Sequence, residues 1–263
     1  MAFRLDDFVI DRIIYGFAEN FDGDGLFVLT QLSDATINIT AESKDAVDMN
    51  GTLIKRFYTG KSGEFSCTNA LLNFNVLGYE SGTGKTIATS QNTIVMPKII
   101  KVAAGGTATL TGLVADSVKV YGISTNGTMG KEYEKGNTAS ATEYAVTSAG
   151  AFTAPTAEAE DAYFIVKYER TVSDGIAIYN SADKFPGTIK LTLKVIGVDP
   201  CSADTVRAMY VEFPSFQISP EVDLTLSTDS GIAFNGTLQV DYCSDDKALY
   251  NIYFAPEDTE EDN

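Results

Sequence analysis

The sequence contains no histidine. It can therefore build neither a Ser-His-Asp nor a Cys-His nucleophile system, and it offers no imidazole ligand to a metal ion. Enzymes without histidine exist, so this absence lowers the expectation of an enzyme without excluding one.

Cysteine is scarce, and Cys67, Cys201 and Cys243 lie far apart in the chain. Their spacing fits neither a disulfide framework nor a zinc motif, so we expect reduced thiols in a protein made in the cytoplasm. No apolar run approaches the ~20 residues that a membrane span needs. The N-terminal stretch "MAFRLDDFVI" has Asp6 and Asp7 where a signal peptide needs an apolar run, and we expect no such peptide.

Basic residues are few: 19 against 36 acidic residues, for a formal net charge of −17 over 263 residues. Such a chain should be soluble and should repel nucleic acid and anionic membrane surfaces. A basic DNA-binding groove is therefore not expected, and neither is a membrane partner.

Strand signals dominate what is present. In "TIKLTLKVIGV" apolar and polar residues alternate, which indicates a strand with one buried face. "EVDLTLSTDSGIAFNGTLQVDY" predicts two strands around a turn. Asn-Gly pairs favour turns because both residues tolerate positive φ, and they occur at Asn50-Gly51, Asn126-Gly127 and Asn235-Gly236.

Helical signals are few. "CTNALLNFNVLG" predicts one short helix with Thr68 or Asn69 as N-cap and Gly78 as its stop, and a weaker helix candidate begins near Ser202. The string "SGTGKT" after the first helix resembles a phosphate-binding loop, but the first glycine of that motif would have to stand at Tyr79. A P-loop also opens a helix, whereas these residues follow one. We expect a plain loop and no nucleotide cofactor.

The segment "NFDGDGLFVLTQ" has part of the spacing of a calcium-binding EF-hand loop starting at Asn20. Its twelfth position is Gln31, where the loop needs a bidentate glutamate, and strand residues follow where a helix should leave. We expect a surface turn and no metal cofactor. The sequence leaves open whether Asp22 and Asp24 form a weak cation site.

Composition changes in the middle of the chain, where short strands separated by turns are rich in Ala, Gly and Thr. This pattern predicts a small β-sandwich at residues 98–170, inserted into a discontinuous β domain formed by 1–97 and 171–256. The charge run at 257–263 is predicted to be a disordered acidic tail. Most of the aromatic residues, Phe57 and Tyr58 among them, are expected to pack in the core.

No catalytic constellation emerges from these residues, and the chain resembles a phage tail tube (major tail) protein. Two stretches carry the likeness: "GLFVLTQLSDATINITAESKDAVDMNGTLIKRFYTGKSGEFSCTNALLNFNVLG" and "SPEVDLTLSTDSGIAFNGTLQVDYCSDDKALYNIYF". They give, in order, a strand, an Asn-Gly hairpin, a strand, a short helix and a closing hairpin with an aromatic strand. The inserted segment is similar to the immunoglobulin-like (Ig-like) domains of phage structural proteins.

The resemblance implies a mainly β fold, a tail-tube-type sandwich or barrel with a short flanking helix plus the Ig-like insert. It also implies a non-enzymatic virion protein that forms stacked six-fold rings, a hollow tube that contacts other tail proteins and lets DNA pass. The hairpin expected to complete the ring and line the channel contains Asp48, Asn50, Gly51, Lys55 and Arg56. Its two cations fit poorly with an acidic channel wall.

Two alternatives remain open. Another virion component, such as a head decoration or baseplate protein, would share the composition. An Ig-like adhesion or carbohydrate-binding module would instead be a soluble monomer with an aromatic patch.

Overall fold

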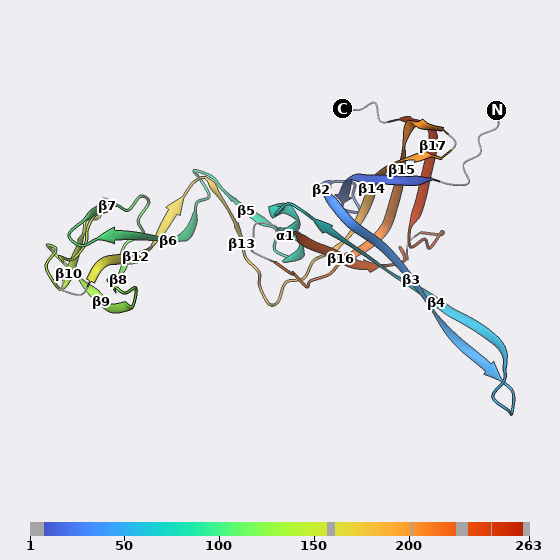
Figure 1. Ribbon diagram of the computed structural model, residues 1–263, viewed down its shortest axis with the longest axis horizontal. Coiled ribbons are helices and arrows are strands. Elements are labelled where there is room, and N and C mark those ends of the chain that lie inside the picture. The colour runs from blue at the N-terminus through green and yellow to red at the C-terminus, as the bar shows by residue number, and fades with distance from the viewer. Residues whose placement is uncertain (1–7, 157–160, 201, 225–230, 243, 260–263) are drawn as a thin grey trace. The chain divides into compact units, whose positions relative to one another are not determined.

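The computed structural model describes residues 8–156, 161–200, 202–224, 231–242 and 244–259 (Figure 1). The protein is mainly β-structure with one short α-helix among the described residues, as predicted. It divides into two compact units, unit 1 (residues 1–85 and 178–263) and unit 2 (residues 86–177). The predicted domain limits at 98 and 170 fall inside strands β6 (Ile94–Ala103) and β12 (Asp161–Val172), and that division stays a prediction.

Unit 1 is built on one eight-stranded sheet with the strand order β2-β1-β14-β15-β16-β4-β3, to which β17 adds by pairing with β15. Strands β2 and β3 stand at opposite ends of this order but follow each other in the chain, joined by Gln31 at a φ of 60°. The sheet therefore curls until its two ends lie together, as a nearly closed barrel. Its elements are β1 (Val9–Glu19), β2 (Gly25–Thr30), β3 (Leu32–Val47), β4 (Leu53–Asn69), α1 (Phe74–Glu80), β14 (Thr188–Asp199), β15 (Ser202–Ile218), β16 (Ile232–Leu238) and β17 (Asn251–Thr259).

Alternating residues of these strands fill the inside of the curled sheet. Strand β14 is the strand predicted from "TIKLTLKVIGV", and its Ile189, Leu191 and Leu193 are almost completely buried. They pack with the rings of Phe213 and Phe216 from β15, whose centroids lie 6.1 Å apart. A single hydrophobic core thus holds unit 1 together.

The predicted short helix is present but begins later than expected. Strand β4 continues to Asn69, so the helix starts at Phe74 with Asn73 as its N-cap, and Gly78 lies inside it. The Asn73 side chain accepts hydrogen bonds from the backbone N–H groups of Asn75 and Val76. Ser81 to Gly84 of "SGTGKT" follow α1 as a turn, as predicted, and Lys85 and Thr86 already belong to strand β5 (Lys85–Ala88).

Two local predictions were wrong. The helix expected near Ser202 is strand β15, which pairs with β14 along its length and so satisfies its backbone in a sheet. The pair Asn235-Gly236 forms no turn: both residues lie within β16, paired with Ser66 and Phe65 of β4. Part of the first strand predicted there, residues 225–230, lies outside the described residues.

Unit 2 contains a seven-stranded sheet with the order β6-β12-β8-β9-β10-β11-β7, antiparallel except between β9 and β10. Its buried core includes Val120, Tyr133, Phe164, Val166 and Tyr168. The remaining strands of the sheet are β7 (Thr107–Thr109), β8 (Lys119–Ser124), β9 (Met129–Gly136), β10 (Glu143–Val146) and β11 (Ala151–Thr153). The Ig-like character of this unit stays a prediction.

Two further strands, β5 (Lys85–Ala88) and β13 (Gly175–Ile178), lie where the chain passes between the units and pair with each other. Strand β17 extends to Thr259, into the segment predicted as a tail, and residues 260–263 lie outside the described residues.

Candidate assembly surface

The hairpin of β3 and β4 is much longer than the sheet that supports it. Strand β16 pairs with β4 only from Gly63 to Asn69, and from Leu53 to Ser62 β4 pairs with β3 alone. We call residues 41–61 the arm. In Figure 1 the arm runs away from the other strands of unit 1 as a two-stranded ribbon, and no other described strand pairs with either of its outer edges.

The tip of the arm is a tight turn organised by Asp48. Its carboxylate accepts hydrogen bonds from the backbone N–H groups of Asn50 and Thr52, each at 2.8 Å. These hydrogen bonds, chiefly the one from Thr52, lower the pKa of Asp48 below its usual value. Gly51 has a φ of 80°, which glycine adopts without strain. The hairpin predicted at Asn50-Gly51 is therefore confirmed, while its role in assembly stays a prediction.

Two of the four cations of the arm, Lys55 and Arg56, are engaged within it. Arg56 donates two hydrogen bonds to Asp45, which lies opposite on β3. The Lys55 ammonium lies 5.4 Å from the centroid of the Phe57 ring on the same strand. Overall the arm contains three acidic and four basic residues, in a chain whose total charge is −17.

Exposed apolar side chains cover the outer part of the arm. Met49 is fully exposed, and Ile54, Phe57 and Tyr58 are more than half exposed. Phe57 and Tyr58 do not pack in the core, contrary to the expectation for most of the aromatic residues, because no second layer of the described residues covers this part of the hairpin. A two-stranded ribbon is marginally stable alone, and exposed apolar groups of this kind mark interaction surfaces.

The segment with part of the spacing of a calcium-binding loop, which starts at Asn20, is a surface turn. Asn20 accepts hydrogen bonds from the backbone N–H groups of Asp22 and Asp24, which closes the turn between β1 and β2. Among the described residues no group of three or more acidic or cysteine side chains could hold a metal ion.

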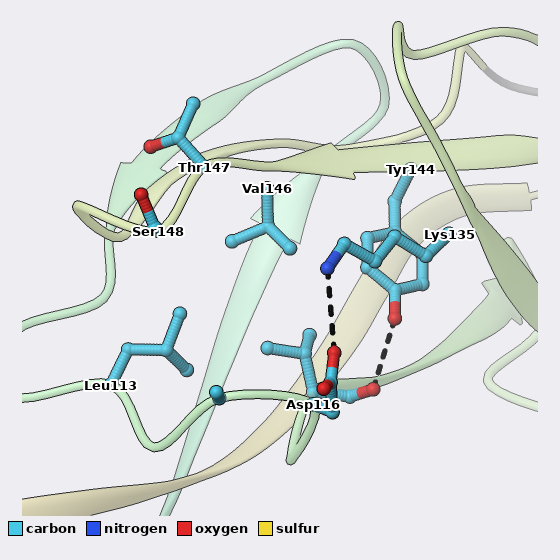
Figure 2. A pocket seen from close by; sticks show the side chains of 9 residues that line it. Leu113, Asp116, Lys135, Tyr144, Val146, Thr147 and Ser148 are labelled. Carbon is cyan, nitrogen blue, oxygen red and sulfur yellow. Dashed lines mark hydrogen bonds and ion pairs between the residues drawn. The ribbon is translucent and has the colours of Figure 1, made fainter.

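A cavity of about 370 Å³ lies within unit 2 (Figure 2). Its wall includes Asp116, whose carboxylate is 3.6 Å from the Lys135 ammonium, and Tyr144, which donates a hydrogen bond to the carbonyl of Val118. The remaining lining consists mainly of aliphatic and hydroxyl side chains. One carboxylate paired with an ammonium is not the pair of convergent carboxylates that most glycoside hydrolases use.

A family model described as the YomU/Tube protein family matches residues 13–252. The chain belongs to this family. The match covers most of both units and confirms the resemblance to phage tail tube proteins. The search of curated proteins found no match.

Membership of the YomU/Tube family makes this chain a structural protein of the phage tail and places it in the virion. No helix in the described part of the chain is long and apolar enough to cross a membrane.

Proposed function

We propose that this protein assembles into six-membered rings that stack into the hollow tail tube, and that phage DNA passes through the channel. The observation that carries the proposal is the arm, a two-stranded ribbon with two free edges and an apolar surface. Exposed strand edges invite pairing with other strands, and natural proteins satisfy them by closing the sheet. In a ring, each arm can pair with the arms of two neighbours, so that a continuous barrel closes.

One ion pair of the arm reduces the affinity that its cations would have for DNA. Every lysine or arginine that contacts a phosphate adds salt-dependent affinity, which would slow passage. Arg56 is neutralised by Asp45. Unit 1 as a whole contains 27 acidic and 12 basic residues, and its formal charge of −15 repels the DNA backbone. The poor fit between the two cations and an acidic channel is thereby reduced.

Electron microscopy of the purified chain tests the proposal. We expect hollow rings or tubes with an axial hole as protein concentration and salt rise, because salt screens the self-repulsion of a chain with a charge of −17. A variant in which residues 43–58 are replaced by an Asn-Gly turn should remain a folded monomer. The matched control replaces Thr125–Thr128, the turn between β8 and β9, with Gly-Ser and should assemble normally.

Two results would contradict the proposal. Persistent monomers of the wild-type chain at every concentration and salt would favour a binding module. Normal tubes from the variant without the arm would show that the arm is not needed for assembly.

A further inference from the structure

The cavity of about 370 Å³ in unit 2 has polar side chains at two ends (Figure 2). Asp116 and Lys135 lie at one end, and Thr147 and Ser148 lie at the other, with Val146 between them. The aliphatic side chains of the lining are Leu113, Ala115, Val118 and Val146. Cavities of this size with an apolar wall and a few polar groups are the usual binding sites for small molecules.

The charged end of the cavity offers one acceptor group and one donor group. The Lys135 ammonium lies 3.6 Å from a carboxylate oxygen of Asp116, which is longer than a direct hydrogen bond. Both side chains are accessible to solvent. The carboxylate therefore keeps lone pairs for a ligand, and the ammonium keeps N–H groups. Two adjacent hydroxyls of one ligand can use both groups, one by donating to Asp116 and the other by accepting from Lys135.

The opposite end of the cavity offers two hydroxyl groups. Thr147 Oγ1 accepts a hydrogen bond from the backbone N–H of Ala151 at 3.1 Å, so its own O–H remains available as a donor. The Ser148 hydroxyl makes no hydrogen bond with the described residues, and it can donate or accept. The cavity therefore presents hydrogen-bonding groups at both ends of an apolar wall.

The chemistry of the lining indicates the class of ligand. It contains one carboxylate and one ammonium, so its formal charge is zero. A sugar ring carries hydroxyls that both donate and accept hydrogen bonds, and the C–H groups on its faces can contact aliphatic side chains. We propose that the cavity binds a neutral saccharide, with adjacent hydroxyls at Asp116 and Lys135 and a further hydroxyl at Thr147 and Ser148. The inference goes beyond the proposed function and does not depend on tube assembly.

Other classes of ligand fit this lining less well. A purely apolar molecule would take water from Asp116, Lys135 and the two hydroxyls without replacing its hydrogen bonds. Burial raises the pKa of Tyr144, and the Glu132 and Asp116 carboxylates raise it further, so both carboxylates lie close to this wall of the cavity. They would repel an anion, and the Lys135 ammonium would repel a cation. A neutral ligand with several hydroxyls meets none of these penalties.

Ligand-observed saturation-transfer NMR on the full-length chain tests the inference, because this measurement works on monomers and on assembled tubes alike. The probes are glucose, galactose, mannose, rhamnose and N-acetylglucosamine, with glucuronate as an anionic comparison. We expect at least one of the neutral sugars to bind with a dissociation constant on the order of 1 mM, as befits a ligand with few atoms. Glucuronate should bind more weakly than that sugar.

Two pairs of variants locate the site. Asp116→Gly removes the carboxylate and suits the φ of 59° at this position, and we expect it to weaken binding about tenfold. Its control is Asp174→Gly, at an exposed bend of unit 2 outside the cavity. Ser148→Phe should block the cavity and abolish saturation transfer, whereas Ala149→Phe, at an exposed position outside the lining, should bind as wild type. Circular dichroism checks the fold of all four variants.

Three results would overturn the inference. The first is an absence of saturation transfer to every neutral probe. The second is binding that Ser148→Phe leaves unchanged, which would place the sugar outside the cavity. The third is tighter binding of glucuronate than of any neutral sugar, which would mean that the cavity recognises an anion. None of these results concerns the arm, so the proposed function would still stand.

Discussion

Arg56 and Asp45 lie directly opposite each other on β4 and β3, and Arg56 donates two hydrogen bonds to the Asp45 carboxylate, from Nε at 2.7 Å and from Nη2 at 2.9 Å. The hydrogen bond from Arg56 is the main cause that lowers the pKa of Asp45 below its usual value. Both side chains are accessible to solvent, so the pair adds little to the stability of the fold. Its main effect is to neutralise a guanidinium on the arm.

Asp45→Asn should therefore make assembled tubes retain DNA. The substitution leaves Arg56 free to bind phosphate, and this binding should weaken steeply as salt rises. The measurement is co-sedimentation of labelled duplex DNA with preformed tubes over a salt series. The double variant Asp45→Asn with Arg56→Gln should return retention to the wild-type level. Equal DNA retention by wild-type and Asp45→Asn tubes at low salt would show that Arg56 does not meet DNA.

The turn at the tip of the arm should loosen at low pH. The pKa of Asp48 is lower in the folded turn than its ordinary value of 3.8, chiefly because of the hydrogen bond from Thr52. Ionised Asp48 therefore contributes stability above that ordinary value, and the contribution is lost as pH falls through the lower folded pKa. The protection of the Gly51 and Thr52 amides against exchange, measured by NMR relative to the intrinsic rate at each pH, should fall in that range. In Asp48→Ala this protection should be low at every pH, whereas Asp22→Ala in another turn should leave the protection of the arm unchanged.

A sequence pattern predicts a turn correctly where the hydrogen bonds and backbone angles that form the turn come from the same few residues. The turn at Asn50-Gly51 is local, because Asp48 and Gly51 supply both the hydrogen bonds and the positive φ. The same dipeptide at Asn235-Gly236 forms no turn, because its glycine is required by residues that lie elsewhere in the sequence. A side chain at Gly236 would overlap the backbone of Gln217 and the ring of Phe216, so glycine is needed there for close strand packing.

Residue burial in the arm likewise depends on residues that are distant in the sequence. Phe65 of β4 is buried, whereas Phe57 on the same strand is exposed, and both are aromatic strand residues in the sequence. What differs is the number of neighbouring strands, since β16 ends opposite Gly63. Only the tertiary structure supplies that information, and the assembly role of the arm could be predicted only from the family resemblance.

Gly236→Ala should destabilise the protein. The added methyl group would require β15 and β16 to move apart, and overpacking of this kind costs about 1–3 kcal/mol. The matched control is Gly60→Ala in the arm, where a methyl group would meet no atom within 4 Å. Urea unfolding of both variants and wild type measures the difference. Equal stability of Gly236→Ala and Gly60→Ala would mean that the strands relax freely at this point.

Glu80, the last residue of α1, is 2% exposed and packs within unit 1 rather than in water. Its Oε2 atom has no hydrogen-bond partner among the described residues. Burial raises the pKa of this carboxyl group to about 7. Burial likewise raises the pKa of the Cys67 thiol to about 12, with a smaller contribution from the nearby Glu80 carboxylate. Both groups are therefore favoured in their neutral forms.

The stability of unit 1 should consequently fall as pH rises through 7. The folded-state pKa of Glu80 lies above its ordinary value of 4.5, so its contribution is fully present below that value and is lost as pH rises through about 7. Glu80→Gln cannot ionise, and we expect it to be more stable than wild type at pH 8, by up to about 3 kcal/mol, with a much smaller difference at pH 5. Urea unfolding at both pH values, at a protein concentration too low for assembly, measures this difference. Glu64→Gln, at an exposed position of β4, serves as the control. A constant difference between Glu80→Gln and wild type at the two pH values would mean that Glu80 keeps an ordinary pKa in the folded protein.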